Sequence, residues 1–176
     1  MIEGKTINLR LIEEDDLEQV AEWRNKSAIK KYFFNIFPIS KWGQKDWFAK
    51  LLSNEKKKLF IIETKEREPI GTIGLDDIDW KNQKAEFGNM LIGDKDNQRK
   101  GYAKDATLTL LKFAFEEMNL NRIYLNVLDF DKKAIRLYEE CGFQKESNLR
   151  QAFFTQGRFC DIVVMSILRQ EFTEKK

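Results

Sequence analysis

The chain has 176 residues, of which 42% are hydrophobic and 34% are charged, and this composition is typical of a folded protein rather than a disordered one. Its 31 lysines and arginines nearly balance its 29 aspartates and glutamates, so the net charge of +2 gives no reason to expect nucleic acid as a partner. The N-terminal segment has no apolar signal core, and no apolar run approaches the ~18 residues that a membrane span needs, so we expect a cytoplasmic protein without a membrane partner.

The sequence contains no histidine, which removes the commonest general base and every Ser-His or Cys-His nucleophile arrangement. Cys141 and Cys160 do not form a CxxC motif, so we expect two buried thiols and no metal site. Acid–base chemistry must therefore come from Glu, Asp, Tyr, Lys, water or the backbone.

The N-terminal part of the chain predicts one strand and two helices. Hydrophobic and polar residues alternate over residues 6–12, the pattern of a half-buried strand. Residues 13–26 begin with acidic side chains, which the helix macrodipole favours at an N-terminus, and continue with apolar residues at helical spacing. After the loop around Pro38, residues 40–54 predict a second helix. Its expected apolar stripe consists of Gln44, Trp47, Phe48, Leu51 and Leu52.

Three strand-like runs follow, over residues 59–64, 70–78 and 85–92. Because the connections between them are short, we expect an antiparallel meander. From Gly101 the apolar period becomes helical, and this helix ends near residues 119–121. Its expected apolar face consists of Ala103, Ala106, Leu110, Leu111, Ala114 and Met118.

Residues 122–128 predict a further strand, which can lie parallel to residues 85–92 because a long helix separates the two in the sequence. The next segment predicts a helix, with Asp131 as its N-cap and Gly142 as its C-terminal stop.

Residues 149–168 predict two strands that turn at Gln156 and Gly157, and residues 173–176 predict a frayed tail. No internal repeat, low-complexity stretch or linker interrupts the chain. We therefore expect a single α+β domain over residues 1–176, with a mixed, mostly antiparallel sheet of about seven strands flanked by about four helices. The length also leaves room for a homodimer interface.

The segment QRKGYA, residues 98–103, lies where a strand ends and a helix begins. Unpaired N–H groups at a helix N-terminus can bind phosphate, and Gly101 lets a ligand approach the backbone because it has no Cβ. The phosphate-binding patterns GxxxxGK[ST] and GxGxxG are both absent. Taken alone, the segment is better explained as an ordinary strand-to-helix loop.

The surroundings of this segment change that interpretation. Together with the order of elements, QRKGYA and the later AIRLYEECGF form a pattern that resembles the GNAT superfamily of acetyl-CoA-dependent N-acetyltransferases over nearly the whole chain. The segments AEWRN, EPIGTIGLDDID, KAEFG and GRFCDIVVMSIL are similar to sequences of its RimJ/RimL-type branch. The resemblance implies the GNAT fold, acetyl-CoA as acetyl donor, and an N-acetyltransferase activity.

By this resemblance, the loop binds the pyrophosphate of coenzyme A through its backbone amides, and the strand before it pairs its backbone with the pantetheine arm. The charges of Arg99 and Lys100 are equally well explained as solvated surface charges. Asp131 stands where the family usually has an asparagine that contacts coenzyme A, and this departure puts that contact in doubt. The residues carried over are Met90, Leu91 and Ile92 on the strand, and Gln98, Arg99, Lys100, Gly101, Tyr102 and Ala103 in the loop.

Tyr138 matches the tyrosine that protonates the departing thiolate in many family members, and a core aromatic is the alternative. Glu86 is implied as the base that takes the proton from the amine. A solvent-facing glutamate without that role is an alternative, as is transfer of the proton to water and backbone carbonyls. A regular strand would place residues 86, 88, 90 and 92 on one face, and the bulge that the family has here would shift that parity.

The resemblance does not specify the amine, because RimJ/RimL-like proteins act on protein N-termini, polyamines or amino sugars on nucleotides. The run IKKYFF, residues 29–34, has cations and aromatics that suit an anionic or sugar-like acceptor somewhat better than a polycation, and packing of the helix pair explains them as well. We expect direct attack of a small-molecule amine on acetyl-CoA, without an acetyl-enzyme. The alternatives are an N-terminal protein acetyltransferase and a non-catalytic acyl-CoA-binding sensor domain.

Overall fold

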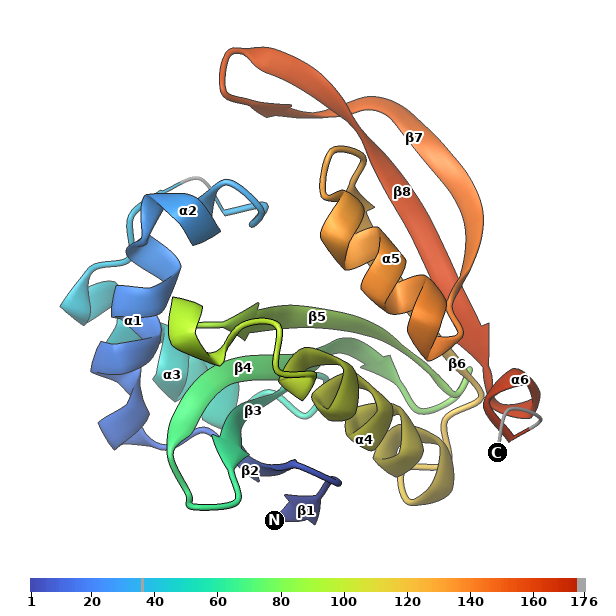
Figure 1. Cartoon of the computed structure of the whole chain (residues 1–176), viewed down its shortest axis with the longest axis horizontal. Coiled ribbons are helices and arrows are strands. Elements are labelled where there is room, and N and C mark those ends of the chain that lie inside the picture. Colours follow the sequence, from blue (N-terminus) through green and yellow to red (C-terminus); the bar gives the residue numbers. More distant parts are fainter. Residues whose placement is uncertain (36, 174–176) are drawn as a thin grey trace.

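The fold is organised around a sheet of eight strands in the order β1-β2-β3-β4-β5-β6-β8-β7 (Figure 1). The computed structural model describes residues 1–35 and 37–173. Neighbouring strands are antiparallel except β5 and β6, which are parallel as predicted. The strands are β1 (Ile2–Glu3), β2 (Ile7–Leu11), β3 (Lys58–Thr64), β4 (Pro69–Asp79), β5 (Lys84–Ile92), β6 (Arg122–Leu128), β7 (Gln144–Thr155) and β8 (Arg158–Leu168).

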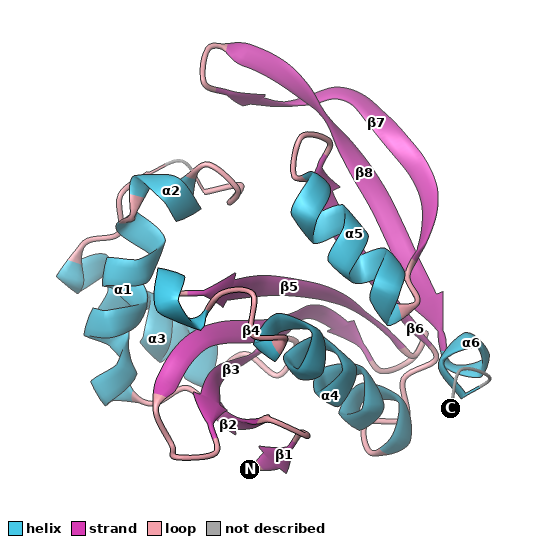
Figure 2. Cartoon of the chain, in the orientation of Figure 1, coloured by secondary structure: helices cyan, strands magenta, loops and turns pink. Residues whose placement is uncertain are grey.

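Helices connect the strands and follow the last of them (Figure 2). Within the described ranges none of them combines the length and the apolar character needed to cross a membrane. Of the expected C-terminal tail, residues 174–176 lie outside the described residues. The helices are α1 (Leu17–Asn25), α2 (Ser27–Lys30), α3 (Lys41–Leu52), α4 (Tyr102–Glu116), α5 (Lys132–Cys141) and α6 (Arg169–Thr173), with short 3-10 helices η1 (Glu14–Asp16) and η2 (Lys95–Asn97).

The predicted α+β class and mixed sheet are confirmed, and the differences concern short or exposed elements. β1, α2 and α6 were not predicted, because two to five residues carry too little periodicity. β7 begins at Gln144 rather than at residue 149, because the first nine residues of this edge strand are exposed and show no apolar alternation.

Each face of the sheet packs against a pair of helices. On one face, α4 and α5 cover the strands, and Leu110, Leu111 and Ala114 of α4 are fully buried there. On the other face, α1 and α3 contribute a smaller cluster that includes Trp23. Leu52 was expected on the apolar stripe of α3 but is 69% exposed, because it lies at the last position of the helix.

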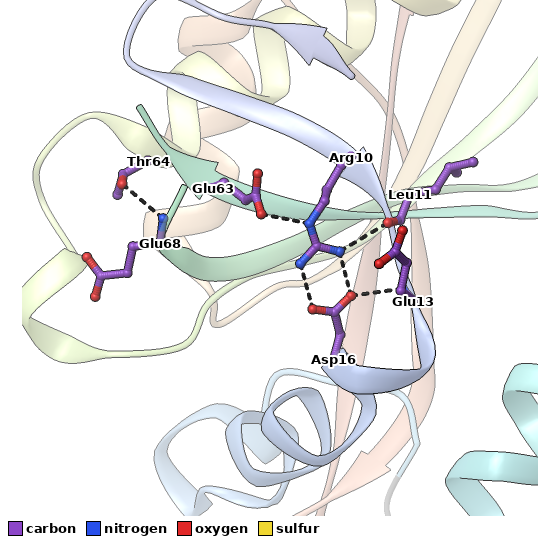
Figure 3. A network of polar contacts seen from close by, with 7 residues as sticks. All are labelled: Arg10, Leu11, Glu13, Asp16, Glu63, Thr64 and Glu68. Carbon is purple, nitrogen blue, oxygen red and sulfur yellow. Dashed lines mark hydrogen bonds and ion pairs between the residues drawn. The ribbon is translucent and has the colours of Figure 1, made fainter. Parts of the chain in front are cut away.

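Arg10 of β2 fixes the start of the α1 layer to the sheet (Figure 3). Its Nη1 and Nη2 donate to the two carboxylate oxygens of Asp16 at 2.6 and 2.7 Å, and its Nε donates to Glu63 of β3 at 2.6 Å. Asp16 also accepts from the backbone N–H of Glu13 at 2.8 Å. Because planar, bidentate arginine–carboxylate pairs are directional, this contact holds the start of α1 against β2 and β3.

The two ends of α5 agree with the sequence prediction. The Asp131 side chain accepts from the backbone N–H of Ala134 at 3.1 Å and is the N-cap. Gly142 ends the helix with φ of 104°, in the left-handed region that favours glycine. These caps place Tyr138 on the side of α5 that faces the sheet, where it is buried.

Candidate active site

β5 and β6 separate after a short parallel pairing. Lys84–Glu86 of β5 pair with Arg122–Tyr124 of β6, and in the described part of the chain the pairing ends there. β5 continues beside β4, toward α1, whereas β6 continues beside β8 on the other side of the opening (Figure 1). We call the line along which the two strands part the seam. Beyond Glu86, the β6 side of β5 has no strand partner among the described residues, so its backbone is available to a ligand.

A β-bulge interrupts β5 along the seam. Thr72 of β4 pairs with Leu91, whereas Gly74 pairs with Gly88, so β5 has one residue more than β4 in this interval. Asn89, inside the bulge, has φ of 54°, a left-handed conformation that asparagine tolerates better than most residues.

The bulge changes which side chains share a face of the sheet. Phe87, Met90 and Ile92 pack on the α4–α5 face, while Leu91 packs with the α1–α3 cluster. Glu86, the neighbour of Phe87, points to the α1–α3 face. The parity shift expected from the resemblance is therefore present, and Glu86 does not share a face with Met90 and Ile92.

Polar side chains hold the bulge in place. The Asn89 side-chain amide donates to Asp76 Oδ2 at 2.8 Å, and the Asn89 carbonyl accepts from Thr72 Oγ1 at 2.7 Å. Lys57 Nζ lies 2.8 Å from Asp76 Oδ1. Lys57 thus forms an ion pair with Oδ1, which is buried and accepts no hydrogen bond from the described residues, and the bulge is tied to β4 and to the start of β3.

The loop at residues 98–103 presents N–H groups at the start of α4. Gly101 is the N-cap, with φ of 84° and no atom within 4 Å of the place a Cβ would occupy. Arg99 is also left-handed, with φ of 64°. In the described chain, the N–H groups of residues 99–103 meet no hydrogen-bond acceptor, whereas that of Gln98 donates to Lys95. A helix N-terminus with unpaired amides is suited to an anion, and the exposed side chains of Arg99 and Lys100 flank it.

Asp105 ties the first turn of α4 to β2. Its carboxylate accepts from Thr6 Oγ1 at 2.8 Å and from the backbone N–H groups of Lys5 and Ile7, each at 3.1 Å. Burial opposes ionisation, but the hydrogen bonds from Thr6, Lys5 and Ile7 outweigh it and lower the pKa of Asp105. The loop at residues 98–103 therefore begins a helix whose position is fixed.

Tyr138 lies in the core between α5 and β5. Its ring makes edge contacts with Phe87, with centroids 5.6 Å apart, and with Phe143, with centroids 5.8 Å apart. Burial raises the pKa of Tyr138, and the nearby Asp131 and Cys141 raise it further. The phenol therefore keeps its proton at neutral pH, which is the state required of a proton donor.

Glu86 lies at the point where the seam opens. Its Oε1 accepts from the Asn126 side-chain amide of β6 at 2.9 Å, so this contact continues the link between the two strands after their backbones part. Burial raises the pKa of Glu86; the hydrogen bond from Asn126 lowers it, and Asp76 and Asp77 raise it. A carboxylate with a raised pKa and a fixed orientation can accept a proton from an ammonium group.

Aromatic side chains connect the two sides of the opening above the seam. Tyr32 contacts Phe130, with ring centroids 6.0 Å apart, and Phe34 meets Phe153 of β7 edge-on at 5.1 Å. The aromatic residues of IKKYFF therefore do more than pack the helix pair, because two of them reach across to the second half of the chain. The third aromatic of the run, Phe33, packs against the α1–α3 cluster.

Comparison with known proteins identifies this arrangement. Residues 6–144 match the family model of the acetyltransferase (GNAT) domain. The chain belongs to the GNAT acetyltransferase family. It is 31% identical over 170 residues to spermidine N(1)-acetyltransferase of Vibrio cholerae serotype O1, covering 96% of both chains.

Solved structures agree with this GNAT assignment. Spermidine N-acetyltransferase from Vibrio cholerae in complex with CoA and spermine is similar with a TM-score of 0.88 and 30% identity, over 96% of this chain and 98% of that one. A dodecameric structure of the Vibrio cholerae enzyme has a TM-score of 0.84 and 29% identity, over 97% of this chain and 98% of that one. The protein is thus an N-acetyltransferase with the GNAT fold, as expected. The similarity does not single out the RimJ/RimL-type branch, because these relatives are spermidine acetyltransferases.

In this GNAT enzyme, Asp131 is placed at the N-terminus of α5, on the same helix as Tyr138. Burial raises the pKa of Asp131, and the hydrogen bond from Ala134 and the nearby lysines act against it. The carboxylate thus caps the helix, and its contact with coenzyme A stays a prediction. Among the described residues, no group of three or more His, Cys, Asp or Glu side chains is arranged to hold a metal ion.

Several residues of this GNAT site were not identified from the sequence. Asn126 orients Glu86, and Asp76 and Asn89 hold the bulge. The sequence contains no signal for them, because each contact joins different strands and depends on the register. The resemblance implies roles for Tyr138 and Glu86, and the fold supplies their partners.

Proposed function

We propose that the enzyme transfers the acetyl group of acetyl-CoA to a primary amine of a small molecule by direct attack in a ternary complex. The observation that supports this most is the seam, because its free β5 backbone is followed by the unpaired amides of residues 99–103 and is flanked by Glu86 and Tyr138. The chain has no histidine to activate a serine or cysteine nucleophile, so the proposal contains no acetyl-enzyme.

The donor lies along the seam in this proposal. The amides of residues 99–103 and the N-terminus of α4 bind the pyrophosphate, with Gln98, Arg99 and Lys100 at its edge. The backbone of residues 90–92 pairs with the pantetheine arm as an added strand would. Asp131 offers an acceptor, but not the amide donor of an asparagine.

The chemistry requires a neutral amine, because an ammonium group has no lone pair. Glu86 takes that proton, and the amine nitrogen forms a bond to the thioester carbonyl carbon. The β5 amides stabilise the oxyanion. The C–S bond then breaks, Tyr138 gives its proton to the sulfur, the new amide nitrogen releases its second proton to water, and Tyr138 regains a proton from solvent. No metal takes part in the proposed reaction.

Two classes of small-molecule acceptor have support. Similarity to spermidine acetyltransferases supports a polyamine. The cations and aromatics of residues 29–34 support an amino sugar nucleotide instead. An N-terminal protein acetyltransferase of the RimJ/RimL type and a non-catalytic acyl-CoA sensor are the alternatives. We further propose a single domain over residues 1–176, a cytoplasmic location and a homo-oligomer, the last because a relative forms a dodecamer.

The test is release of free thiol from acetyl-CoA in the presence of amine and peptide panels. We expect turnover with small amines, and we expect Tyr138→Phe to lower kcat by roughly 10²- to 10⁴-fold without loss of thermal stability, because only a hydroxyl is removed from the core. An unchanged rate would remove Tyr138 from the mechanism. Thermal stabilisation by acetyl-CoA without turnover on any amine would support the sensor, and turnover with peptides alone would support the protein acetyltransferase.

A further inference from the structure

Arg24, in the last turn of α1, is a partly buried cation without a carboxylate partner. Its Cζ lies 4.7 Å from the centroid of the Phe33 ring, a cation–π contact. Within the described ranges its guanidinium meets no hydrogen-bond acceptor, and burial lowers the pKa of Arg24. A guanidinium has five N–H donors; none of those of Arg24 is fully buried without a partner, so water can satisfy them until a ligand replaces it. Arg24 is therefore prepared for an acceptor that the chain itself does not provide.

Arg24 lines a cavity of about 350 Å³ next to the bulge of β5. The walls come from α1, the segment before α3, α3 itself and the sheet, and they include Asn35, Gln44, Lys57 and Asn89. Asn89 is the bulge residue, so the cavity lies directly against the strand that carries Glu86. Its size is that of a small-molecule site, and its lining contains several hydrogen-bond donors.

The charges around this cavity do not balance. Lys57 pairs with one oxygen of Asp76 at 2.8 Å, and the Asn89 amide occupies the other. Asp76 attracts Arg24 electrostatically, but no hydrogen bond joins the two side chains, and Asp76 Oδ1 accepts none from the described residues. In the described chain, the cavity lining itself therefore carries two cations, Arg24 and Lys57, and no carboxylate. Glu86, which pairs with Asp76 in the β4–β5 register, lies beyond it on the same face of the sheet.

We propose that Arg24 and Lys57 bind an anionic group, a carboxylate or a phosphate, of the amine that the enzyme acetylates. This inference rests on the proposed function and specifies its acceptor as a molecule with an amine at one end and an anion at the other. The amine lies near Glu86 and the anion against the arginine fork, which pairs with carboxylate and phosphate through two parallel hydrogen bonds. A polyamine offers Arg24 no acceptor, and its ammonium groups are repelled there.

Matched pairs of acceptors test the inference on the full-length enzyme. Glucosamine is compared with glucosamine 6-phosphate, and 1,4-diaminobutane with 4-aminobutanoate, with spermidine and a UDP-linked amino sugar alongside. We expect the anionic member of at least one pair to have the higher kcat/KM, and the pair that responds distinguishes phosphate from carboxylate. Arg24→Met should reduce that preference roughly 10- to 100-fold, the effect of losing hydrogen bonds to a charged group, while the KM for acetyl-CoA stays unchanged.

Two further variants make the result independent of the folding of Arg24→Met. Lys57→Met should reduce the same preference, and Arg24→Lys should retain part of it, because it keeps the charge without the fork. Arg67→Met, an exposed arginine in the β3–β4 turn, is the matched control and should change nothing. The inference would be overturned, with the proposed function intact, if kcat/KM were higher for spermidine and the diamine than for the anionic acceptors and if Arg24→Met and Lys57→Met left these kcat/KM ratios unchanged. Absence of acetylation of every amine would overturn the proposed function together with it.

Discussion

Replacing Asn89 tests whether the bulge of β5 depends on its side chain. Asn89→Ala removes the hydrogen bond to Asp76 and places an alanine at φ of 54°. The hydrogen bond to a carboxylate contributes roughly 1.5–3 kcal/mol, and a left-handed alanine costs about 1 kcal/mol. Asn89→Gly loses the same hydrogen bond but tolerates the backbone conformation. We therefore expect the Asn89→Gly protein to be more stable than the Asn89→Ala protein by about 1 kcal/mol, whereas in most helices and strands alanine is the more stabilising of the two residues.

The assay is thermal unfolding together with steady-state kinetics. In a chain of this size, 1 kcal/mol corresponds to roughly 2–4 °C in Tm. Both variants should lower kcat/KM by roughly ten- to a hundredfold, because the bulge aims the β5 amides at the reacting carbonyl. Gln83 is a control for the backbone alone, since it has φ of 51° in the β4–β5 turn and makes no side-chain hydrogen bond to the described residues. Gln83→Gly should leave stability and rate close to wild type.

The result that would refute this reasoning is an Asn89→Ala protein as stable as Asn89→Gly. Equal Tm values would mean that the left-handed conformation is not retained in the variant, so that β5 reverts to a regular strand. Wild-type kinetics in both variants would show that the bulge does not position the reacting groups.

Two further predictions concern pH. Burial raises the pKa of Glu86, and the charges of Asp76 and Asp77 raise it further. We therefore expect kcat/KM to fall as the pH drops through that raised pKa. Glu86→Gln should lower kcat/KM by roughly 10²-fold and abolish this acid limb of the pH profile. An acid limb that persists in the variant would assign the proton to water. The pKa of Asp105 is lowered, so its carboxylate stabilises the fold above the unfolded-state pKa of about 4, and this contribution is lost as the pH falls through the folded-state value. Asp105→Asn should cost about 1–2 kcal/mol at pH 7, after allowance for solvent exposure, and the gap in Tm from wild type should narrow below pH ~4; a constant gap would contradict this account.

The sequence was sufficient to predict the elements whose structure depends on residues close together in the chain. The strand predicted over residues 122–128 is the β6 that is observed, because its apolar alternation is bounded by turn residues. Asp131 and Gly142 predicted both ends of α5, because a cap depends on a side chain and a backbone conformation within one turn of the helix.

The features that the sequence did not predict depend on strand register and on contacts between segments far apart in the chain. Nothing in the sequence KAEFGNMLI marks Asn89 as the bulge, because the extra residue is defined only by pairing with β4. Arg24 reads as a helix residue at apolar spacing, and only the fold reveals that it lines a cavity beside Lys57. The motifs could therefore predict the acetyl donor, whereas the proposed acceptor side is formed by residues that no motif connects.

A ligand in the seam would also affect the stability of the folded enzyme. Two halves of the sheet are joined across β5 and β6 by the pairing of Lys84–Glu86 with Arg122–Tyr124 and by the Glu86–Asn126 contact, so a ligand lying along the seam acts as a missing strand. A ligand that binds only the folded chain stabilises it by about 2.7 kcal/mol when its free concentration is a hundred times its Kd. If the acetyl donor binds along the seam as proposed, we expect a larger fraction of chains to be unfolded and open to proteolysis when the donor is scarce, so that the abundance of the enzyme follows the supply of its substrate.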